Sequence, residues 1–301
     1  MRYSSLILVL SSALSLQAVH ADQVKPIQES FEPKAPADLN AYTKVAVIQF
    51  APHGVAPISQ DKSLVDAFKK STRDALEEEI RTAAANGAKL IITPEFGLVG
   101  YPDIPELEDE DDNFRNRDDV DEYVETVPGP TSRYFGKLAK ELGVYIHIGL
   151  VEVDAKTKKY YNTAVALSPA GDVVASYRKM GLFEIEENYL SAGEEGFTYD
   201  APFGRVGLII CSDVYHTEPL ASYRRSKVDV IALSTSWAQM NTGWGFFTRA
   251  ARENNAYLLA ANMPYFPDSG VINPDGSAQS HFRQTARAIG YGYLPNKKAR
   301  R

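Results

Sequence analysis

The sequence predicts an α/β protein built as a four-layer α-β-β-α sandwich, in which two mostly parallel sheets lie face to face with helices outside. Two observations support this prediction. Short apolar strands alternate with segments of helical periodicity, and this alternation occurs twice, on either side of an antiparallel hairpin. Each run therefore predicts one sheet whose faces are both covered.

The first run begins after residue 42 and contains three apolar strands and two helices. The helix over 63–87 has an apolar face and stops at Asn86-Gly87, and the helix over 131–143 has a threonine cap and a glycine stop. The strands are expected at Val45–Gln49, Leu90–Thr93 and Tyr145–Gly149.

The hairpin over 162–179 turns through Pro169-Ala170-Gly171-Asp172 and leads into the second run. This run repeats the order of the first. Its strands are expected at Val206–Ile210, Val230–Ser234 and Tyr257–Ala260, and its helices over 218–227 and 245–256.

The first 21 residues have the layout of a secretory signal peptide. Arg2 precedes an apolar run from Leu6 to Leu16, and cleavage is expected after Ala21. The apolar run is too short to span a bilayer, which disfavours a membrane anchor. We therefore expect a periplasmic or secreted protein that has no membrane contact after cleavage.

Composition limits the remaining possibilities. Removing the leader leaves roughly 280 residues, enough for one large α/β domain. Lysine and arginine number 32 against 39 aspartate and glutamate residues, a formal net charge of −7, which argues against nucleic-acid binding. A proline-rich arm over 22–42 is expected to run over the surface, followed by one domain over 43–301.

Three reactive side chains stand where predicted strands end. Glu95 follows the strand "LIITP", Lys179 closes "VVASYRK" and Cys211 closes "VGLII". Ligands of α/β sheets gather at the carboxyl ends of strands, so we expect these groups to meet there. They fit nucleophilic acyl transfer: Glu95 takes the thiol proton, Lys179 stabilises the thiolate and the oxyanion, and the N–H of Ser212 adds a second donor.

Cys211 is the only cysteine in the 301 residues, so it has no partner for a disulfide within the chain. Taken alone, it is either a small buried hydrophobe or a nucleophile that must stay free. Asp213 and His216 lie close by and suggest a Cys-His protease. A histidine five residues along a tight strand-to-helix turn is, however, poorly placed as the base of that cysteine.

No metal or cofactor is predicted. The acid-rich segment 106–123 lacks the glycine and the spacing of an EF-hand loop, which favours a solvated lid or edge loop over a metal site. The sequence contains no glycine-rich phosphate loop and no histidine cluster for zinc.

The segments "TPEFGLVGYP", "YRKMGLFEIEENYLSAG" and "GLIICSDVYHTEP" resemble, in this order, the three signature blocks of the carbon–nitrogen hydrolase, or nitrilase, superfamily. The resemblance covers Thr43 to Leu294. It implies a nitrilase-type α-β-β-α sandwich and a Glu-Lys-Cys triad. In that triad Glu95 is the general base, Lys179 stabilises the oxyanion, and Cys211 forms a thioester with the acyl group of the substrate.

The superfamily also has a second glutamate in the loop after the lysine, often with an aromatic residue three positions later. Glu186 fits this position because Tyr189 lies three residues after it, and Glu187 is the next candidate. The alternative, an ordinary loop acid, stays open.

Segment 234–262 resembles the biotinidase and vanin (pantetheinase) branch of the superfamily. Typical members of that branch carry many cysteines and an additional C-terminal domain, whereas this sequence has one cysteine and ends soon after the matched segment. Trp237 and Tyr101, with Trp244, are candidate walls of the acyl pocket, although buried aromatic residues more often belong to the core.

The sequence thus predicts an exported thiol hydrolase that cleaves the amide bond of a small molecule without a cofactor. A nitrilase using the same residues and an inactive exported binding protein of the same fold remain alternatives. A homodimer is an open alternative for the oligomeric state.

Overall fold

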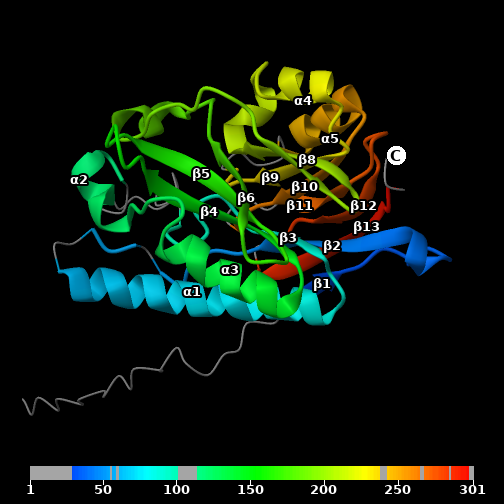
Figure 1. Ribbon diagram of the computed structural model, residues 1–301, viewed down its shortest axis with the longest axis horizontal. Helices are drawn as coiled ribbons and strands as arrows, with labels where there is room; N and C mark the ends of the chain where they lie inside the picture. Colours follow the sequence, from blue (N-terminus) through cyan, green and yellow to red (C-terminus); the bar gives the residue numbers. More distant parts are fainter. Residues whose placement is uncertain are drawn as a thin grey trace, which may run out of the picture.

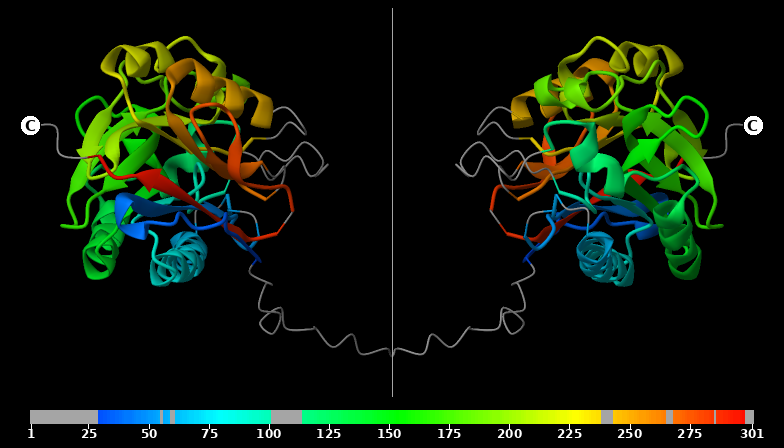
Figure 2. Two further views of the ribbon diagram at one scale, coloured as in Figure 1. Left: turned by 90° about the vertical axis from the view of Figure 1, so that its right-hand side faces the viewer. Right: turned by 90° about the vertical axis from the view of Figure 1, so that its left-hand side faces the viewer.

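The computed structural model describes residues 29–54, 56–58, 61–100, 114–237, 243–264, 268–284 and 286–297. Two β-sheets lie face to face, and helices cover the outer face of each (Figure 1). Views turned by 90° show the four layers in succession (Figure 2). The α-β-β-α sandwich predicted from the sequence is confirmed.

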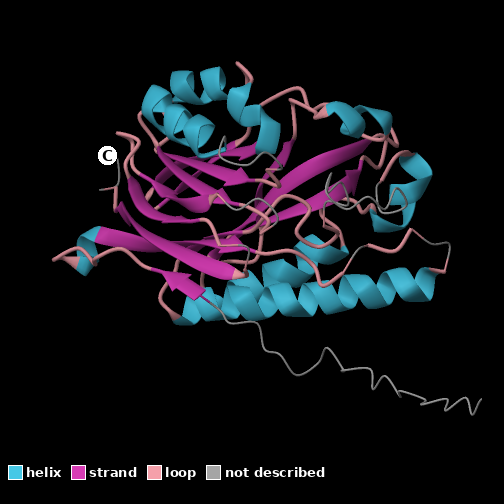
Figure 3. Cartoon of the chain, turned by 180° about the vertical axis from the view of Figure 1, so that it is seen from behind, coloured by secondary structure: helices cyan, strands magenta, loops and turns pink. Residues whose placement is uncertain are grey.

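Within the described residues the first sheet has seven strands, and its centre is parallel as predicted. Helices α1 (Lys62–Ala85) and α3 (Pro130–Leu142) pack on its outer face, and α1 is the long helix beneath the sheet in Figure 3. The strands lie in the order β1 (Glu29–Phe31), β13 (Ala288–Pro295), β2 (Tyr42–Gln49), β3 (Leu90–Ile92), β4 (Tyr145–Val153), β5 (Tyr160–Leu167) and β6 (Val173–Arg178).

The second sheet has six strands in the part of the chain that the structure describes, again with three parallel strands at its centre. Helices α4 (Leu220–Ser226) and α5 (Gly243–Asn254) cover it. The strands lie in the order β12 (Ala278–Phe282), β11 (Ser269–Ile272), β10 (Tyr257–Ala261), β9 (Val230–Ser234), β8 (Gly204–Ile210) and β7 (Thr198–Ala201).

The main apolar core lies between the two sheets. Val47 and Ile92 of the first sheet and Leu208 and Leu259 of the second belong to one buried cluster. Separate clusters lie beneath the helices of each outer layer. Burial on both faces explains why the central strands read as continuous apolar runs rather than as alternating patterns.

The ends of the two long helices of the first layer follow from local sequence. The side chain of Asp61 accepts a hydrogen bond from the backbone N–H of Ser63 at 2.9 Å and caps α1. Helix α3 begins at Pro130 after the N-cap Gly129, so the predicted threonine cap is wrong. It ends before Gly143 as predicted, and the φ of 65° at that residue favours glycine.

The last strands were not predicted. After β10 the chain adds β11 and β12 to the second sheet and then crosses to the first, where β13 pairs antiparallel with β2 and parallel with β1. Local periodicity does not show which sheet a strand will join, because the partner is distant in sequence.

The arm expected over 22–42 differs from a segment that merely runs over the surface. Residues 29–31 form the edge strand β1, and the ring of Phe31 stacks on Phe282 with centroids 4.8 Å apart. Tyr42 is already the first residue of β2. The arm is therefore partly built into the sheet edge, which would otherwise offer unpaired backbone groups.

Part of the acid-rich segment is helical rather than an open loop. Arg117–Val120 forms the short helix α2 and Asp121–Tyr123 the 3-10 helix η3, with Val120 and Tyr123 buried. Residues 106–113 of the predicted lid lie outside the described residues. None of the described helices is both long and apolar enough to cross a membrane.

Candidate active site

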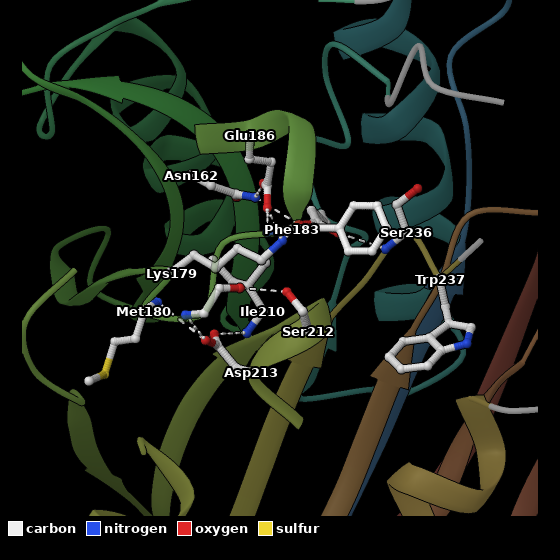
Figure 4. A network of polar contacts seen from close by, with 12 residues as sticks. Asn162, Lys179, Met180, Phe183, Glu186, Ile210, Ser212, Asp213, Ser236 and Trp237 are labelled. Carbon is white, nitrogen blue, oxygen red and sulfur yellow. Dashed lines mark hydrogen bonds and ion pairs between the residues drawn. The ribbon is translucent and has the colours of Figure 1, made fainter. Parts of the chain in front are cut away.

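Polar side chains from both sheets meet at one end of the sandwich. Glu95 follows β3, Lys179 follows β6 and Cys211 follows β8, as the strand-end reasoning predicted. Figure 4 shows the polar network, in which Asn162, Lys179 and Glu186 lie at one end and Asp213 at the other.

One ammonium group joins two carboxylates. The Nζ atom of Lys179 lies 2.8 Å from Oε1 of Glu95 and 2.6 Å from Oε2 of Glu186. The Nδ2 atom of Asn162, from β5, donates to Oε1 of Glu95 at 2.7 Å and to Oε1 of Glu186 at 2.8 Å. Each of the three charged side chains is at most 1% exposed, so water screens these interactions little.

The structure distinguishes between the candidates for the second glutamate. The 3-10 helix η4 (Glu184–Asn188) directs Glu186 inward, where its carboxylate also accepts a hydrogen bond from the N–H of Phe183 at 2.7 Å. Glu184 and Glu187, on the same short helix, are exposed. Glu186 is thus the acid that joins the cluster.

Glu95 is held by the backbone around it. The N–H of Ser236 donates to its second oxygen at 2.9 Å, and the following residue, Phe96, has a φ of 46°. Strand β4 approaches this turn so closely that a Cβ atom on Gly149 would lie 2.8 Å from both the nitrogen of Phe96 and the oxygen of Pro94. Only glycine allows this approach.

Opposing effects set the charges of the cluster. Burial raises the pKa of Glu95, the positive charge of Lys179 lowers it, and the negative charge of Glu186 raises it again, with a net rise. Burial alone would lower the pKa of Lys179, but the charges of Glu186 and Glu95 raise it well above its usual value. Lys179 therefore stays an ammonium, and Glu95 holds a proton more readily than an exposed glutamate.

Cys211 stands at a strained turn beside this cluster. It is the first residue of the 3-10 helix η5 (Cys211–Tyr215), and its φ is 42°, unusual for a residue other than glycine. Burial and then the negative charge of Glu95 raise the pKa of the thiol to about 12, while Lys179 opposes them. The thiol is neutral at rest and needs a base when it reacts.

Asp213 fastens this turn to the loop that follows Lys179. Its side chain is fully buried, and its Oδ1 accepts hydrogen bonds from the N–H of Met180 at 3.2 Å and of Gly181 at 2.8 Å. Its Oδ2 accepts from the hydroxyl of Tyr177 at 2.7 Å and from the N–H of Ile210 at 2.9 Å. These four donors satisfy both oxygens of the carboxylate. None of them is a histidine, whereas the acid of a protease triad bonds to one.

Burial raises the pKa of Asp213 to about 6, although the hydrogen bonds from Gly181, Tyr177 and Ile210 oppose the rise. His216, the other residue of the protease alternative, packs its ring against Gly181, where a Cβ atom would lie 2.3 Å from its Cδ2. Neither residue is arranged as the base of a Cys-His protease.

The remaining predicted residues lie in different surroundings. Ser212 is buried, and its hydroxyl donates to the carbonyl oxygen of Gly181 at 2.5 Å. The ring of Trp237 lies 5.9 Å from that of Tyr215, whose pKa is raised by burial and then by the charge of Cys211. Trp244 instead stacks on His281 at 3.6 Å. Tyr101 lies outside the described residues.

Sequence reasoning missed Asn162 and the positioning role of Asp213. Asn162 is a fully buried amide near the start of β5, just before the apolar run 164–167, and an amide beside such a run was the signal that could have identified it. In the described ranges no group of three or more histidine, cysteine, aspartate or glutamate side chains could hold a metal ion.

The model of the carbon-nitrogen hydrolase family matches residues 44–295. The chain belongs to this family. The matched range agrees with the resemblance read from the three sequence blocks.

Curated relatives of this carbon-nitrogen hydrolase carry several activities. This chain is 28% identical to a nitrilase of Pyrococcus abyssi, over 82% of its own length and 87% of the relative. It is 29% identical to the human omega-amidase over 73% of this chain and 81% of the relative. It is 26% identical to bovine pantetheinase over 76% of this chain but only 49% of that protein. These similar identities do not single out one branch.

Solved structures support the fold. Nit3 of Saccharomyces cerevisiae, a member of branch 10 of the nitrilase superfamily, superposes with a TM-score of 0.69 at 21% identity, covering 85% of this chain and 90% of that one. An amidase from Nesterenkonia sp. gives 0.67 at 20% identity, covering 85% and 91%. Together the family and its relatives show that this protein is a hydrolase acting on carbon–nitrogen bonds other than peptide bonds.

Proposed function

We propose that this hydrolase cleaves small-molecule amides through a thioester on Cys211. The observation that carries the proposal is the ammonium of Lys179, fixed between Glu95 and Glu186 and close enough to Cys211 for the charges to interact. A lysine ammonium has three N–H donors, and the described carboxylates take two of them. The third remains for an oxygen that becomes negative during the reaction.

In the first half of the reaction the sulfur of Cys211 attacks the amide carbonyl carbon, and the thiol proton passes to Glu95. The carbonyl oxygen becomes an oxyanion, stabilised by Lys179 and by the backbone N–H of Ser212. The carbon–nitrogen bond then breaks, the proton moves from Glu95 to the leaving nitrogen, and ammonia or an amine departs.

In the second half a water molecule gives a proton to Glu95 and attacks the thioester carbon. The carbon–sulfur bond breaks, its electron pair returns to sulfur, and Glu95 returns the proton to the resulting thiolate. The raised pKa of Glu95 suits this cycle because the group must both accept and release a proton. Asn162 and Glu186 orient Glu95 and Lys179 without contacting the reacting atoms in this scheme.

A panel of small amides tests the proposal by release of ammonia or amine from the wild type and from Cys211→Ala. The panel includes ω-amides, pantetheine and biotinyl conjugates, because omega-amidase and pantetheinase relatives are found and the sequence resembles the biotinidase branch. Turnover by the wild type alone is expected. Comparable turnover by a folded Cys211→Ala protein would contradict the proposal.

A nitrile substrate is the second candidate, favoured by the similarity to the Pyrococcus abyssi nitrilase. The same residues can attack a nitrile carbon, so product analysis distinguishes the two activities. A nitrilase releases acid from a nitrile, whereas an amidase releases acid only from the amide. If neither substrate class is turned over and iodoacetamide fails to modify Cys211, the inactive binding protein becomes the better interpretation.

We also propose export to the periplasm or the medium, on the evidence of the leader-like residues 1–21. N-terminal sequencing of protein from the native host is expected to begin at Asp22, and a chain that retains Met1 would contradict export by cleavage. Light scattering on the purified protein tests the homodimer alternative, which stays a prediction.

A further inference from the structure

Thr235 lies beside the nucleophile although it is distant from it in sequence. Strands β8 and β9 are parallel neighbours, and Ile210 of β8 pairs in register with Ser234 of β9. The next residues along the two strands are Cys211 and Thr235. The side chain after each strand end therefore enters the same region, where the carboxyl ends of the two strands meet.

The hydroxyl of Thr235 is buried without a conventional partner. The residue is fully buried, and its Oγ1 makes no hydrogen bond of normal geometry to any residue in the described ranges. Its backbone N–H, by contrast, donates to the carbonyl oxygen of Ala261 at 2.9 Å and fixes the residue in place. Burying an unpaired hydroxyl costs stability, so its presence at this position needs a reason.

The group that this hydroxyl faces is the thiol of Cys211. Burial and the charge of Glu95 raise the pKa of the thiol, whereas the charge of Lys179 and then the hydroxyl of Thr235 lower it. The hydroxyl is thus close enough to favour the thiolate, but its hydrogen bond to sulfur is not fully formed in the resting enzyme. A donor of this kind tightens its hydrogen bond when its acceptor becomes charged.

The other charged or titratable groups around the thiol have separate tasks. Glu95, from the end of β3, and Lys179, from the end of β6, act on the proton and the oxyanion in the proposed reaction. Glu186 of η4 and Tyr215 of η5 also act electrostatically on this region. The ionised Glu95 and Glu186 cannot donate a hydrogen bond to a thiolate, and the one N–H of Lys179 that these carboxylates leave over is assigned to the oxyanion in the proposed reaction.

We propose that Thr235 is a further catalytic residue, whose hydroxyl donates a hydrogen bond to the sulfur of Cys211 whenever that sulfur carries negative charge. This occurs just before the carbon–sulfur bond forms and again when it breaks and the electron pair returns to sulfur. The proton stays on Oγ1 throughout, so Thr235 stabilises charge and transfers nothing. The inference deepens the proposed function, in which Cys211 is the nucleophile.

The same strand end also holds the base. The N–H of Ser236, next to Thr235, donates to Glu95 at 2.9 Å, and the N–H of Trp237 donates to Asn262 Oδ1 at 2.8 Å. Thr235, the residue after β9, therefore faces Cys211, and the next residue, Ser236, contacts Glu95. A substitution that keeps the side-chain shape of Thr235 best preserves the contact of Ser236 with Glu95.

Thr235→Val meets this condition because valine keeps the branched shape and removes only the hydroxyl. The rate of alkylation by the neutral reagent iodoacetamide, measured from pH 6 to 10, reports the reactivity of the thiol. We expect Thr235→Val to react about tenfold or more slowly than the wild type at neutral pH. It should therefore reach any given alkylation rate at a pH about one unit higher than the wild type does. Thr235→Ser, which keeps a hydroxyl, should restore most of the rate.

Thr72→Val is the matched control. Thr72 of α1 is also buried with a hydroxyl that has no partner among the described residues, and it belongs to a helix of the outer layer. Both valine variants should melt at or above the temperature of the wild type, because each loses an unpaired buried hydroxyl. Only Thr235→Val should change thiol reactivity. If it melts lower, Thr235→Ala provides the same comparison without the added methyl group.

Wild-type alkylation rates in folded Thr235→Val and Thr235→Ala would overturn the proposal, and so would an equal loss of reactivity in Thr72→Val. Alkylation requires no amide turnover, so this result is independent of the proposed function. That function fails on a different observation, namely amide turnover by Cys211→Ala.

Discussion

The carboxylate of Glu186 lies 2.6 Å from the ammonium of Lys179, and neither side chain is more than 1% exposed. A buried charge is costly unless it is paired, so each group depends on the other. Glu95, which bonds the same ammonium at 2.8 Å, can then accept and release a proton while Lys179 remains charged. Lys179 can thus stabilise negative charge throughout the reaction, while Glu95 transfers the proton.

Glu186→Gln tests this separation. The negative charge of Glu186 raises the pKa of Glu95, so its removal should lower that pKa. Glu95 must be ionised to act as a base, and the acidic limb of the kcat/KM profile should therefore move to lower pH. We expect kcat to fall by about a hundredfold, because Lys179 loses one of the two groups that orient it. An acidic limb that stays in place, or moves to higher pH, would show that Glu186 does not act on Glu95.

Lys179→Met should affect both rate and stability. Losing the ammonium removes one oxyanion donor, worth about a hundredfold or more in kcat, with little change expected in KM. It also leaves two buried carboxylates without a cation, at a cost of roughly 3–5 kcal/mol in the free energy of unfolding near neutral pH.

The pH dependence of Lys179→Met follows from the same charges. Without Lys179, burial and the charge of Glu186 raise the pKa of Glu95 and only the hydrogen bond from Asn162 lowers it, so its pKa in the folded state rises further above that in the unfolded chain. Stability from such a group is present below the unfolded pKa and is lost as the pH rises through the folded pKa. The variant should therefore be stabilised on acidification. Lys137→Met, on the exposed face of α3, is the control and should change little.

Gly149→Ala should impair catalysis although it changes no polar side chain. The added Cβ atom would lie 2.8 Å from the backbone on either side of Glu95, so that turn must shift. We expect a loss of about 1–3 kcal/mol in stability and a fall in kcat that exceeds any change in KM. Gly245→Ala is matched to it, because a Cβ atom there meets nothing within 4 Å, and it should keep wild-type kinetics. Equal effects in the two variants would contradict this role of Gly149.

Asp213→Asn should loosen the turn that carries Cys211. Each oxygen of Asp213 accepts two hydrogen bonds, so an amide NH2 in place of one oxygen would face donors. We expect a lower melting temperature and slower alkylation of Cys211. Tyr177→Phe, which removes one of the four donors, should have a smaller effect in the same direction.

The stability gap between the wild type and Asp213→Asn should also depend on pH. Burial raises the pKa of Asp213 to about 6, so the folded state binds its proton more tightly than the unfolded chain. The stability that this group contributes is lost as the pH rises through about 6, and the gap should narrow over that range. A gap that widens instead would mean that the hydrogen bonds outweigh burial.

The sequence predicted those parts of the fold that depend on local pattern. The parallel strands at the centre of each sheet are buried on both faces and read as apolar runs, and the polar residues that end them proved to be neighbours. The crossing of β13 to the first sheet and the pairing of β1 were not predicted, because their partners lie far away along the chain.

The same limit applies within the site. Glu95, Lys179 and Cys211 could be chosen for their chemistry at strand ends, but Glu186 was chosen by resemblance, since Glu187 beside it is the same residue type. Burial distinguishes them, and burial depends on the folded turn. Asn162, Asp213 and Thr235 act through contacts between segments that are distant in sequence, which no local pattern contains.

In the proposed reaction Cys211 is acylated and Glu95 serves as the base in both halves. A single-turnover experiment on Glu95→Gln tests it, with the mass of the Cys211 peptide followed over time after mixing with an amide that the wild type hydrolyses. We predict slow formation of an acyl adduct at Cys211 that then persists, because hydrolysis needs the same base. Acylation and deacylation at wild-type rates would show that Glu95 is not the base, and turnover with no adduct on Cys211 at any time would contradict the thioester mechanism.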